Sequence, residues 1–279
     1  MTKMAFPPLN LVMWQGTRDM LNGYAKVVGK VRQALAPAQK HWWHVSLHVG
    51  GTGLVTPPMP CEGGSVAITL DLVRDEVRAE RSDGAVWGRP LRGQTVGQFY
   101  DELMGGLAGM GVTAEVERKQ FDAWRTSEYD GAAATNYWNA LVAVDQVMKR
   151  FKGEQRRETS PVQLWPHHFD LAMLWLSGRL IAGQDTEDAE YSDEQMNFGF
   201  ATGDGSVAEA YFYVTAYPLP EGWLGSALPS GAYWLEEGFK GAVLPYSAVV
   251  KAEDGEGLLL SFLRTTLKSG SVLMQGEVT

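Results

Sequence analysis

Two short segments hold all five histidines of the chain: residues 41–48, HWWHVSLH, and residues 165–170, WPHHFD. An imidazole titrates near neutral pH and binds transition metals, so histidines gathered in this way are candidates for acid–base catalysis or metal ligation. The predicted catalytic residues are His44, His168 and Asp170. Whether the two segments form one site depends on the elements that carry them.

If residues 44–48 are extended, His44 and His48 lie on one face but about 13 Å apart, at roughly 3.3 Å per residue. They do not share one metal ion, whose ligands lie about 2 Å away. His168 and Asp170, two apart on a second predicted strand, would be neighbours on one face. We predict a site of His168, Asp170 and one of His44 or His48, working as an acid–base pair or holding a divalent metal. The alternative is that these groups hydrogen-bond backbone at strand ends and do nothing further.

The second half of the chain supplies aromatic and carboxylate candidates. In YFYVTAY, residues 211–217, the tyrosines fall on one face of an expected strand. Such a row makes a wall for a flat or sugar-like ligand, or it is half-buried packing with hydroxyls at the rim. Tyr191 and Glu194 could reach a ligand, or they are ordinary surface residues beside an acidic loop. The predicted ligand-binding set is Trp43, His48, Tyr191, Glu194, Tyr211 and Tyr213.

Composition narrows the class of protein. A net charge of −9 and the lack of a Lys/Arg stripe interleaved with aromatic residues argue against a nucleic-acid partner. The single cysteine, Cys61, allows no intramolecular disulfide and fits a reducing compartment. The first 16 residues contain a Pro-Pro break where a signal peptide needs an apolar run, and no stretch reaches the roughly 18 apolar residues of a membrane span. A cytoplasmic protein without a membrane partner is expected.

The first half is expected to contain a helix, an antiparallel sheet and a second helix. Apolar spacing predicts the first helix from Thr17, its expected N-cap, to Leu35. Alternation predicts strands over 44–49 and within 65–81, and Thr95 with Gln98 forms the capping box of a helix that reaches residue 110. The second half repeats this order, with predicted helices over 135–152 and 258–267 and strands near 162–165, 169–176, 197–202 and 209–217.

This repetition leads to an α+β fold of two similar halves, each with a helix, three to four antiparallel strands and a helix, packed with a pseudo-two-fold relation. Aligning HWWHVSL with WPHHFDLA places His44 over His168 and Ser46 over Asp170, which suggests an internal duplication. The predicted boundaries are 1–115, a linker at 116–134, and 135–279, forming one globular unit. A Pro/Gly-rich segment at 218–231, with Trp223 at its centre, covers a pocket or is a plain connection.

Several segments together resemble a bacterial family of uncharacterised proteins, DUF5996: VGKVRQALAP, HWWHVSLHVGGTGLVT, SPVQLWPHHFDLAMLWLSGR, YSDEQMNFGF, YFYVTAYP and LPYSAVV, in matching order over most of the chain. The resemblance implies no activity. It does imply that the family pattern keeps Trp42, Trp43, Phe169, Asp170, Ser177, Gly178, Tyr191 and Ser192. This chain departs from the pattern at Pro166, His167 and His168, which weakens His168 as a family-wide ligand and strengthens Asp170, Trp43 and Tyr191.

No P-loop, GxSxG, HExxH or CxxC motif is present, so those enzyme classes lose support. We predict a small-molecule pocket between the two halves, lined by Trp43, His44, Asp170 and tyrosines, with catalysis by His and Asp as its enzymatic form. The same pocket without turnover would be a ligand-sensing regulatory module. The alternative is a non-catalytic interaction or assembly protein that binds a partner through exposed aromatic residues. The acidic charge favours neutral or cationic ligands.

Overall fold

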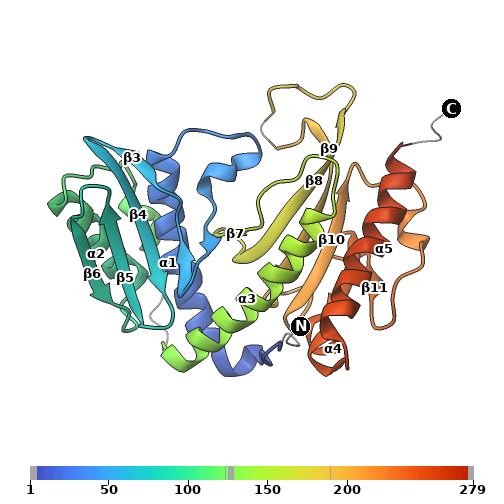
Figure 1. Ribbon diagram of the computed structural model, residues 1–279, viewed down its shortest axis with the longest axis horizontal. Coiled ribbons are helices and arrows are strands. Elements are labelled where there is room, and N and C mark those ends of the chain that lie inside the picture. The colour runs from blue at the N-terminus through green and yellow to red at the C-terminus, as the bar shows by residue number, and fades with distance from the viewer. Residues whose placement is uncertain (1–4, 123, 125–128, 189, 276–279) are drawn as a thin grey trace. The chain divides into compact units, whose positions relative to one another are not determined.

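The computed structural model describes residues 5–122, 124, 129–188 and 190–275 (Figure 1). The chain is α+β, as predicted, with two antiparallel sheets and flanking helices. It divides into two compact units. The N-terminal unit comprises Val12–Trp138 and Gln163–Phe169, and the C-terminal unit comprises Met1–Leu11, Asn139–Val162 and Asp170–Thr279. The predicted linker, 116–134, includes residues 123 and 125–128, which lie outside the described residues.

The first helix, α1 (Leu11–Leu35), starts earlier than its sequence pattern predicts. Thr17 is therefore not an N-cap: it lies inside the helix, and its hydroxyl oxygen accepts a hydrogen bond from the backbone N–H of Asp130 at 2.9 Å. The predicted apolar stripe is confirmed, because Tyr24, Val28 and Val31 are fully buried or nearly so. The stripe holds α1 against the rest of the N-terminal unit.

The sheet of the N-terminal unit is an antiparallel meander. Its order is β1 (His48–Val49), β2 (Gly53–Val55), β4 (Gly64–Asp71), β5 (Glu76–Arg81) and β6 (Val86–Pro90), while β3 (Met59–Cys61) pairs with β4. The predicted hairpin within 65–81 is confirmed, with Ile68 opposite Ala79. The edge strand β6 was not predicted because VWGRP carries no clear alternation of apolar and polar residues.

The predicted strand over 44–49 is confirmed only in its second half, where Leu47 forms a β-bridge and His48–Val49 is a strand; His44 and Val45 are not in a strand. Lys40–Val45 forms the short 3₁₀ element η1, in which His41 and Trp42 have φ angles of 51° and 57°. Two successive left-handed residues turn the chain and cannot lie in a strand. Leu47 instead exchanges backbone hydrogen bonds with Leu164, in the short strand β7 (Gln163–Trp165), at 2.8 and 2.7 Å.

The helix α2 (Val96–Gly109) begins with the predicted capping box, in which Thr95 and Gln98 exchange hydrogen bonds of 3.1 and 3.0 Å. The rings of Tyr24 on α1 and Phe99 on α2 stack at 4.4 Å, so the two helices pack together. Gly106 of α2 faces Trp87 of β6 so closely that a Cβ would overlap the indole. A short 3₁₀ turn, η2 (Arg118–Phe121), follows.

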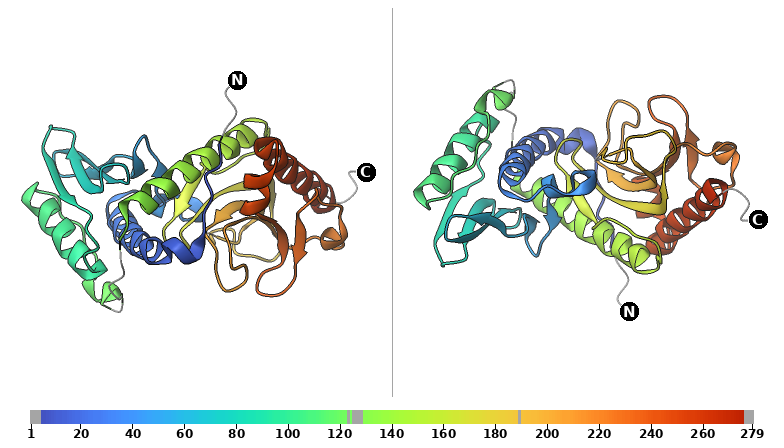
Figure 2. Two further views of the ribbon diagram at one scale, coloured as in Figure 1. Left: turned by 90° about the horizontal axis from the view of Figure 1, so that it is seen from below. Right: turned by 90° about the horizontal axis from the view of Figure 1, so that it is seen from above.

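The C-terminal unit is built on a second antiparallel sheet (Figure 2). Within this unit the strand order is β11 (Tyr233–Leu235), β12 (Gly241–Pro245), β10 (Tyr211–Tyr217), β9 (Asp193–Ala201) and β8 (Asp170–Leu180). Phe198 of β9 contacts Phe151 of α3 (Gly131–Gly153) at 5.1 Å, and α5 (Gly255–Gln275) contacts β8, β9 and β10. Ion pairs Arg150–Glu256, at 2.5 Å, and Arg264–Glu154 join the two helices. Both therefore cover the same face of this sheet.

The segment 218–231 is tied to the core of the C-terminal unit. Trp223, in the short element η3 (Trp223–Gly225), is fully buried, its indole N–H donates to Ser269 Oγ at 3.0 Å, and its ring lies 4.9 Å from that of Trp234. It is not an exposed aromatic residue of the kind that a partner protein would contact. The strand β12 and the helix α4 (Tyr246–Lys251) were not predicted. Among the described helices, none combines the length and the apolar character that a bilayer crossing requires.

Two neighbouring glycines of α2 test the packing of this helix on β6. We expect Gly106→Ala to destabilise the protein by about 1–3 kcal/mol, because the added methyl displaces the Trp87 indole. Gly105→Ala is the matched control, since its Cβ would meet nothing within 4 Å. It should stabilise the helix by up to about 1 kcal/mol through helix propensity alone. Urea unfolding of both variants measures the difference, and equal stabilities would contradict the close packing.

Candidate functional site

The two units divide the predicted site residues between them. Asp170, Tyr191, Glu194, Tyr211 and Tyr213 belong to the C-terminal unit, whereas Trp43, His44, His48 and His168 belong to the N-terminal unit. Each unit contains its own cluster of buried polar side chains.

In the C-terminal unit the cluster lies on the sheet face opposite α3 and α5. Along β10, Phe212 and Val214 are buried towards the helices, and the alternate residues Tyr211 and Tyr213 point the other way. Tyr213 is opposite Gly199 on β9, where a Cβ would overlap the phenol ring. The glycine lets this ring cross β9.

Asp170 is the partner that Tyr213 reaches. The carboxylate stands at the start of β8 with its residue only 6% exposed, and the Tyr213 hydroxyl donates a hydrogen bond to Oδ2. Burial raises the pKa of Tyr213 well above its usual value, and the nearby charge of Asp170 raises it further. The hydroxyl therefore stays protonated at physiological pH and remains a hydrogen-bond donor.

Two amide side chains extend this cluster along β9. Asn197 hydrogen-bonds the Tyr213 hydroxyl, and the amide N–H of Gln195 donates to the backbone oxygen of Glu190 at 2.8 Å. The carbonyl oxygens Asn197 Oδ1 and Gln195 Oε1 are buried and have no hydrogen-bond partner in the described structure. Because residues 195 and 197 alternate on one face of the strand, both oxygens belong to the polar face that carries Tyr213. We call Asp170, Gln195, Asn197 and Tyr213 the acceptor face.

The other predicted residues of this unit have structural partners. Tyr211 donates to Asp204 Oδ2 at 2.5 Å, and Asp204 in turn accepts from the backbone N–H groups of a turn at residues 206–207. Glu194 pairs with Arg179 at 2.7 Å. Tyr191 is 43% exposed, with its ring 5.1 Å from that of Tyr217. Tyr211 and Glu194 therefore hold local structure, and Tyr191 lies at the surface.

In the N-terminal unit a second cluster surrounds Ser46. The Arg32 guanidinium donates from Nη1 to the Ser46 carbonyl oxygen, and to its hydroxyl at 3.0 Å. The hydroxyl lies 2.6 Å from Gln163 Oε1 and 3.0 Å from the carbonyl oxygen of Trp43. The Ser46 hydroxyl has one proton to donate, and the shorter distance indicates that it donates this proton to Gln163 Oε1. We call Arg32, Trp43, His44, Ser46 and Gln163 the Ser46 cluster.

His44 is a buried acceptor in this cluster. Its Nδ1 accepts a hydrogen bond from the backbone N–H of Gln39 at 3.1 Å. Burial lowers its pKa, the hydrogen bond from Gln39 opposes that shift, and the positive charge of Arg32 lowers the pKa further. The imidazole is therefore neutral near pH 7 and carries its proton on Nε2.

His168 and Asp170 do not share a strand face as predicted. Phe169 has a φ of 58°, and its N–H donates to the oxygen of Trp165 at 2.8 Å, so residues 166–169 form a turn and β8 begins only at Asp170. His168 is exposed, with its ring 4.3 Å from that of His167. Within the described part of the chain, no three His, Cys, Asp or Glu side chains are grouped to hold a metal ion.

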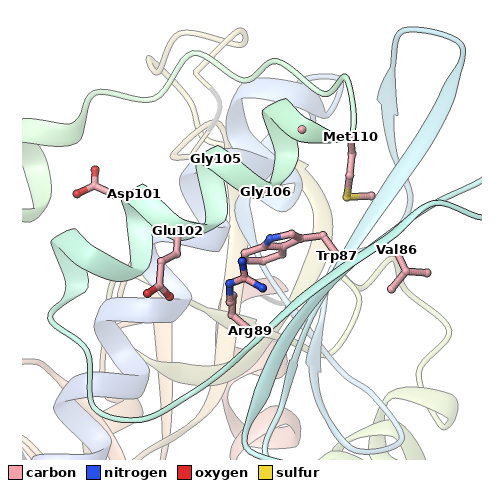
Figure 3. Close-up of a pocket in the computed structure, with 9 residues that line it drawn as sticks. Val86, Trp87, Arg89, Asp101, Glu102, Gly105, Gly106 and Met110 are labelled. Atoms are coloured by element: carbon pink, nitrogen blue, oxygen red, sulfur yellow. The ribbon is translucent and has the colours of Figure 1, made fainter.

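A surface groove lies between β6 and α2 of the N-terminal unit (Figure 3). It encloses about 460 Å³, with Trp87 and Arg89 on the strand side and Glu102 on the helix side. The Arg89 guanidinium lies 5.9 Å from the centre of the Trp87 ring. The further lining residues are Val86, Asp101, Gly105, Gly106, Gly109 and Met110. The groove could not be predicted from the sequence, because the residues of β6 show no clear alternation of apolar and polar side chains.

Replacing Tyr213 with Phe tests the acceptor face. We expect Tyr213→Phe to destabilise the protein by about 1–3 kcal/mol, because the buried carboxylate of Asp170 loses a hydrogen bond from the tyrosine hydroxyl. Tyr233→Phe is the control, since Tyr233 is 40% exposed, and should stay within about 0.5 kcal/mol of the parent protein. Both values come from urea unfolding, and a Tyr213→Phe variant of unchanged stability would contradict the assignment.

His44 should make stability depend on pH. Above pH 6.5 the imidazole is neutral in both states; as the pH falls, the unfolded chain takes up a proton before the folded one, whose His44 pKa is lower. Stability is therefore lost between pH 6.5 and the folded pKa. His44→Asn keeps an acceptor for the Gln39 N–H but does not titrate, so it should show a smaller loss between pH 8 and pH 5 in urea unfolding. If the parent protein and His44→Asn lose the same stability between pH 8 and pH 5, the pKa of His44 is not lowered in the folded protein.

Comparison with known proteins places the chain in a family. No curated protein and no solved structure is detectably similar to it. One family, described as a family of unknown function (DUF5996), matches residues 6–277, nearly the whole chain, and so confirms the resemblance found in the sequence. The chain therefore belongs to the DUF5996 family.

Proposed function

We propose that this protein binds a small molecule on the acceptor face of its C-terminal unit. The observation that carries the proposal is the pair of buried carbonyl oxygens, Asn197 Oδ1 and Gln195 Oε1, which have no partner in the described structure and lie on the sheet face that also carries the buried carboxylate of Asp170. Buried polar atoms are nearly always hydrogen-bonded, so these two acceptors call for a donor from outside the described chain. A ligand that carries N–H or O–H groups supplies such donors.

The chemistry of the face selects the class of ligand. Carboxylate and amide oxygens accept hydrogen bonds, which favours hydroxylated or amine-bearing molecules over anions. The net charge of −9 acts in the same direction, because it favours neutral or cationic ligands. The Tyr213 ring, which lies across Gly199, adds an aromatic surface beside the acceptors.

If the protein is an enzyme, Asp170 is its proposed catalytic residue. Its carboxylate would accept a proton from the bound ligand, while Tyr213 holds it in place through the hydrogen bond to Oδ2. The involvement of His44 and His168, and the location of the pocket between two halves, stay predictions. A role in ligand sensing uses the same face without turnover.

A second candidate function, binding of a protein partner, is favoured by the groove between β6 and α2. The strand β6 is at the edge of its sheet, Val86 is 57% exposed, and Trp87 lines the groove. An edge strand next to a groove can accept an extended peptide. A Val86→Glu variant should lose such a partner and keep any ligand bound at Asp170.

The order of elements supports a further proposal, that the two units arose by duplication. In each unit one helix precedes an antiparallel sheet and another follows it, and the pairs α1 with α2 and α3 with α5 each pack together. We also propose a cytoplasmic location, consistent with the single cysteine. An experimental structure whose units fail to superpose would contradict the first proposal, and cell fractionation tests the second.

The direct test of ligand binding is a thermal-shift screen against a library of amines, sugars and other hydroxylated metabolites, with divalent metals included. A compound that binds the folded state raises the melting temperature by mass action. We expect a hit whose shift is lost in Asp170→Asn and reduced in Asn197→Leu. Glu237→Gln removes an exposed carboxylate of the same unit and should respond like the parent protein.

The variants must first be shown to be folded by circular dichroism. A hit that survives in Asp170→Asn would place the ligand elsewhere. If no compound of the library raises the melting temperature, the proposed ligand site on the acceptor face is wrong, and the groove at β6 is the remaining candidate.

A further inference from the structure

Arg32 is a buried cation of the N-terminal unit without an acidic partner among the described residues. Only 5% of the residue is exposed, and its hydrogen bonds from Nη1 go to the neutral carbonyl and hydroxyl oxygens of Ser46. No carboxylate of the described residues forms an ion pair with it, and burial alone lowers its pKa, to about 10. A buried charge is strongly unfavourable unless a counter-charge or several hydrogen bonds compensate it.

Three hydrogen-bond donors of the Ser46 cluster lack acceptors. The unpaired groups are Arg32 Nε, Trp43 Nε1 and Gln163 Nε2, and each is buried. Each residue is connected to Ser46: Arg32 donates to it, Gln163 Oε1 lies 2.6 Å from its hydroxyl, and the Trp43 carbonyl oxygen lies 3.0 Å from the same hydroxyl. Among the buried side-chain atoms of this cluster, all those that lack a partner in the described structure are donors.

His44 contributes one more N–H group to the cluster. Its Nδ1 accepts from the backbone N–H of Gln39, so the neutral ring carries its proton on Nε2 as another donor. The cluster thus combines one formal positive charge with N–H groups from a guanidinium, an indole, an amide and an imidazole. This donor set is complementary to an anion.

The backbone beside the cluster is strained. His41 and Trp42 hold φ angles of 51° and 57°, in a region that side chains other than glycine enter at an energetic cost. This turn leads directly into Trp43 and His44. Strain of this kind is retained where the surrounding structure enforces it, and it is frequent at ligand sites.

We propose that the Ser46 cluster binds the carboxylate group of a small-molecule ligand. The Arg32 guanidinium uses Nη1 for Ser46, which leaves the edge formed by Nε and Nη2 without a described acceptor. That edge matches the two oxygens of a planar carboxylate, which it can bind through two parallel hydrogen bonds. Trp43 and Gln163 supply further N–H groups. This site is independent of the acceptor face, since it lies in the other unit and takes the opposite ligand chemistry.

The test is thermal unfolding of the full-length protein in sodium benzoate, sodium acetate or sodium phosphate, each compared with sodium chloride at equal ionic strength. We expect the two carboxylates to raise the melting temperature above the chloride control. Arg32→Gln should weaken the apparent affinity for benzoate at least about ten-fold, because hydrogen bonds to charged groups are worth that much. A melting temperature that no carboxylate raises, or that only phosphate raises, overturns the proposal.

If Arg32→Gln fails to fold, the Trp43→Phe variant tests the same cluster. It keeps an aromatic ring and removes the indole N–H, a buried donor without a partner in the described structure, together with part of the ring. The variant should remain folded, and benzoate should raise its melting temperature less than that of the parent protein. Trp42→Phe is the matched control, because the neighbouring indole is 43% exposed, and it should respond like the parent. A benzoate response that is equal in all three proteins overturns the assignment to this cluster.

Discussion

One-sided coverage by helices is the constraint on which the polar face of the C-terminal unit depends. In that unit α3 and α5 lie on the same face of the sheet, and in the N-terminal unit α1 and α2 pack together. Because successive residues of a strand point to opposite faces, the side chains that contact the helices alternate with side chains that point away from them. Phe212 and Val214 take the helix side of β10, so Tyr211 and Tyr213 are free to carry hydroxyl groups on the other. The polar face thus follows from how the sheet is covered.

The two polar clusters lack opposite kinds of hydrogen-bond partner. The acceptor face has unpaired oxygens at Gln195 and Asn197, whereas the Ser46 cluster has unpaired N–H groups at Arg32, Trp43 and Gln163. The unpaired groups of one cluster cannot satisfy each other, because a carbonyl oxygen does not donate to a carbonyl oxygen and an N–H group does not accept from another N–H group. The acceptor face therefore favours ligands that donate hydrogen bonds, and the Ser46 cluster favours ligands that accept them.

Local signals in the sequence were sufficient for α2 and for the hairpin of β4 and β5, because a capping box and strand alternation need only neighbouring residues. The strand predicted over 44–49 starts too early because residues 40–45 form a 3₁₀ element with left-handed residues at 41 and 42, which the alternation of apolar and polar residues does not reveal. Asp170 and Tyr213 were each named from sequence, but they are 43 positions apart and their contact depends on sheet register. Arg32 carried a usable signal, since it stands four residues after a buried position of the apolar stripe of α1.

The passage of the Tyr213 ring over Gly199 couples two positions that face each other across β9 and β10. Any side chain at 199 would occupy the space through which the phenol reaches Asp170, so the two positions cannot vary independently. Within the DUF5996 family, a member with a larger residue at the position of Gly199 should carry a shorter one opposite it, and its carboxylate at the position of Asp170 would then need a different donor. The pair at 199 and 213 can therefore serve as a marker that sorts family members into those that keep this hydroxyl–carboxylate contact and those that have replaced it.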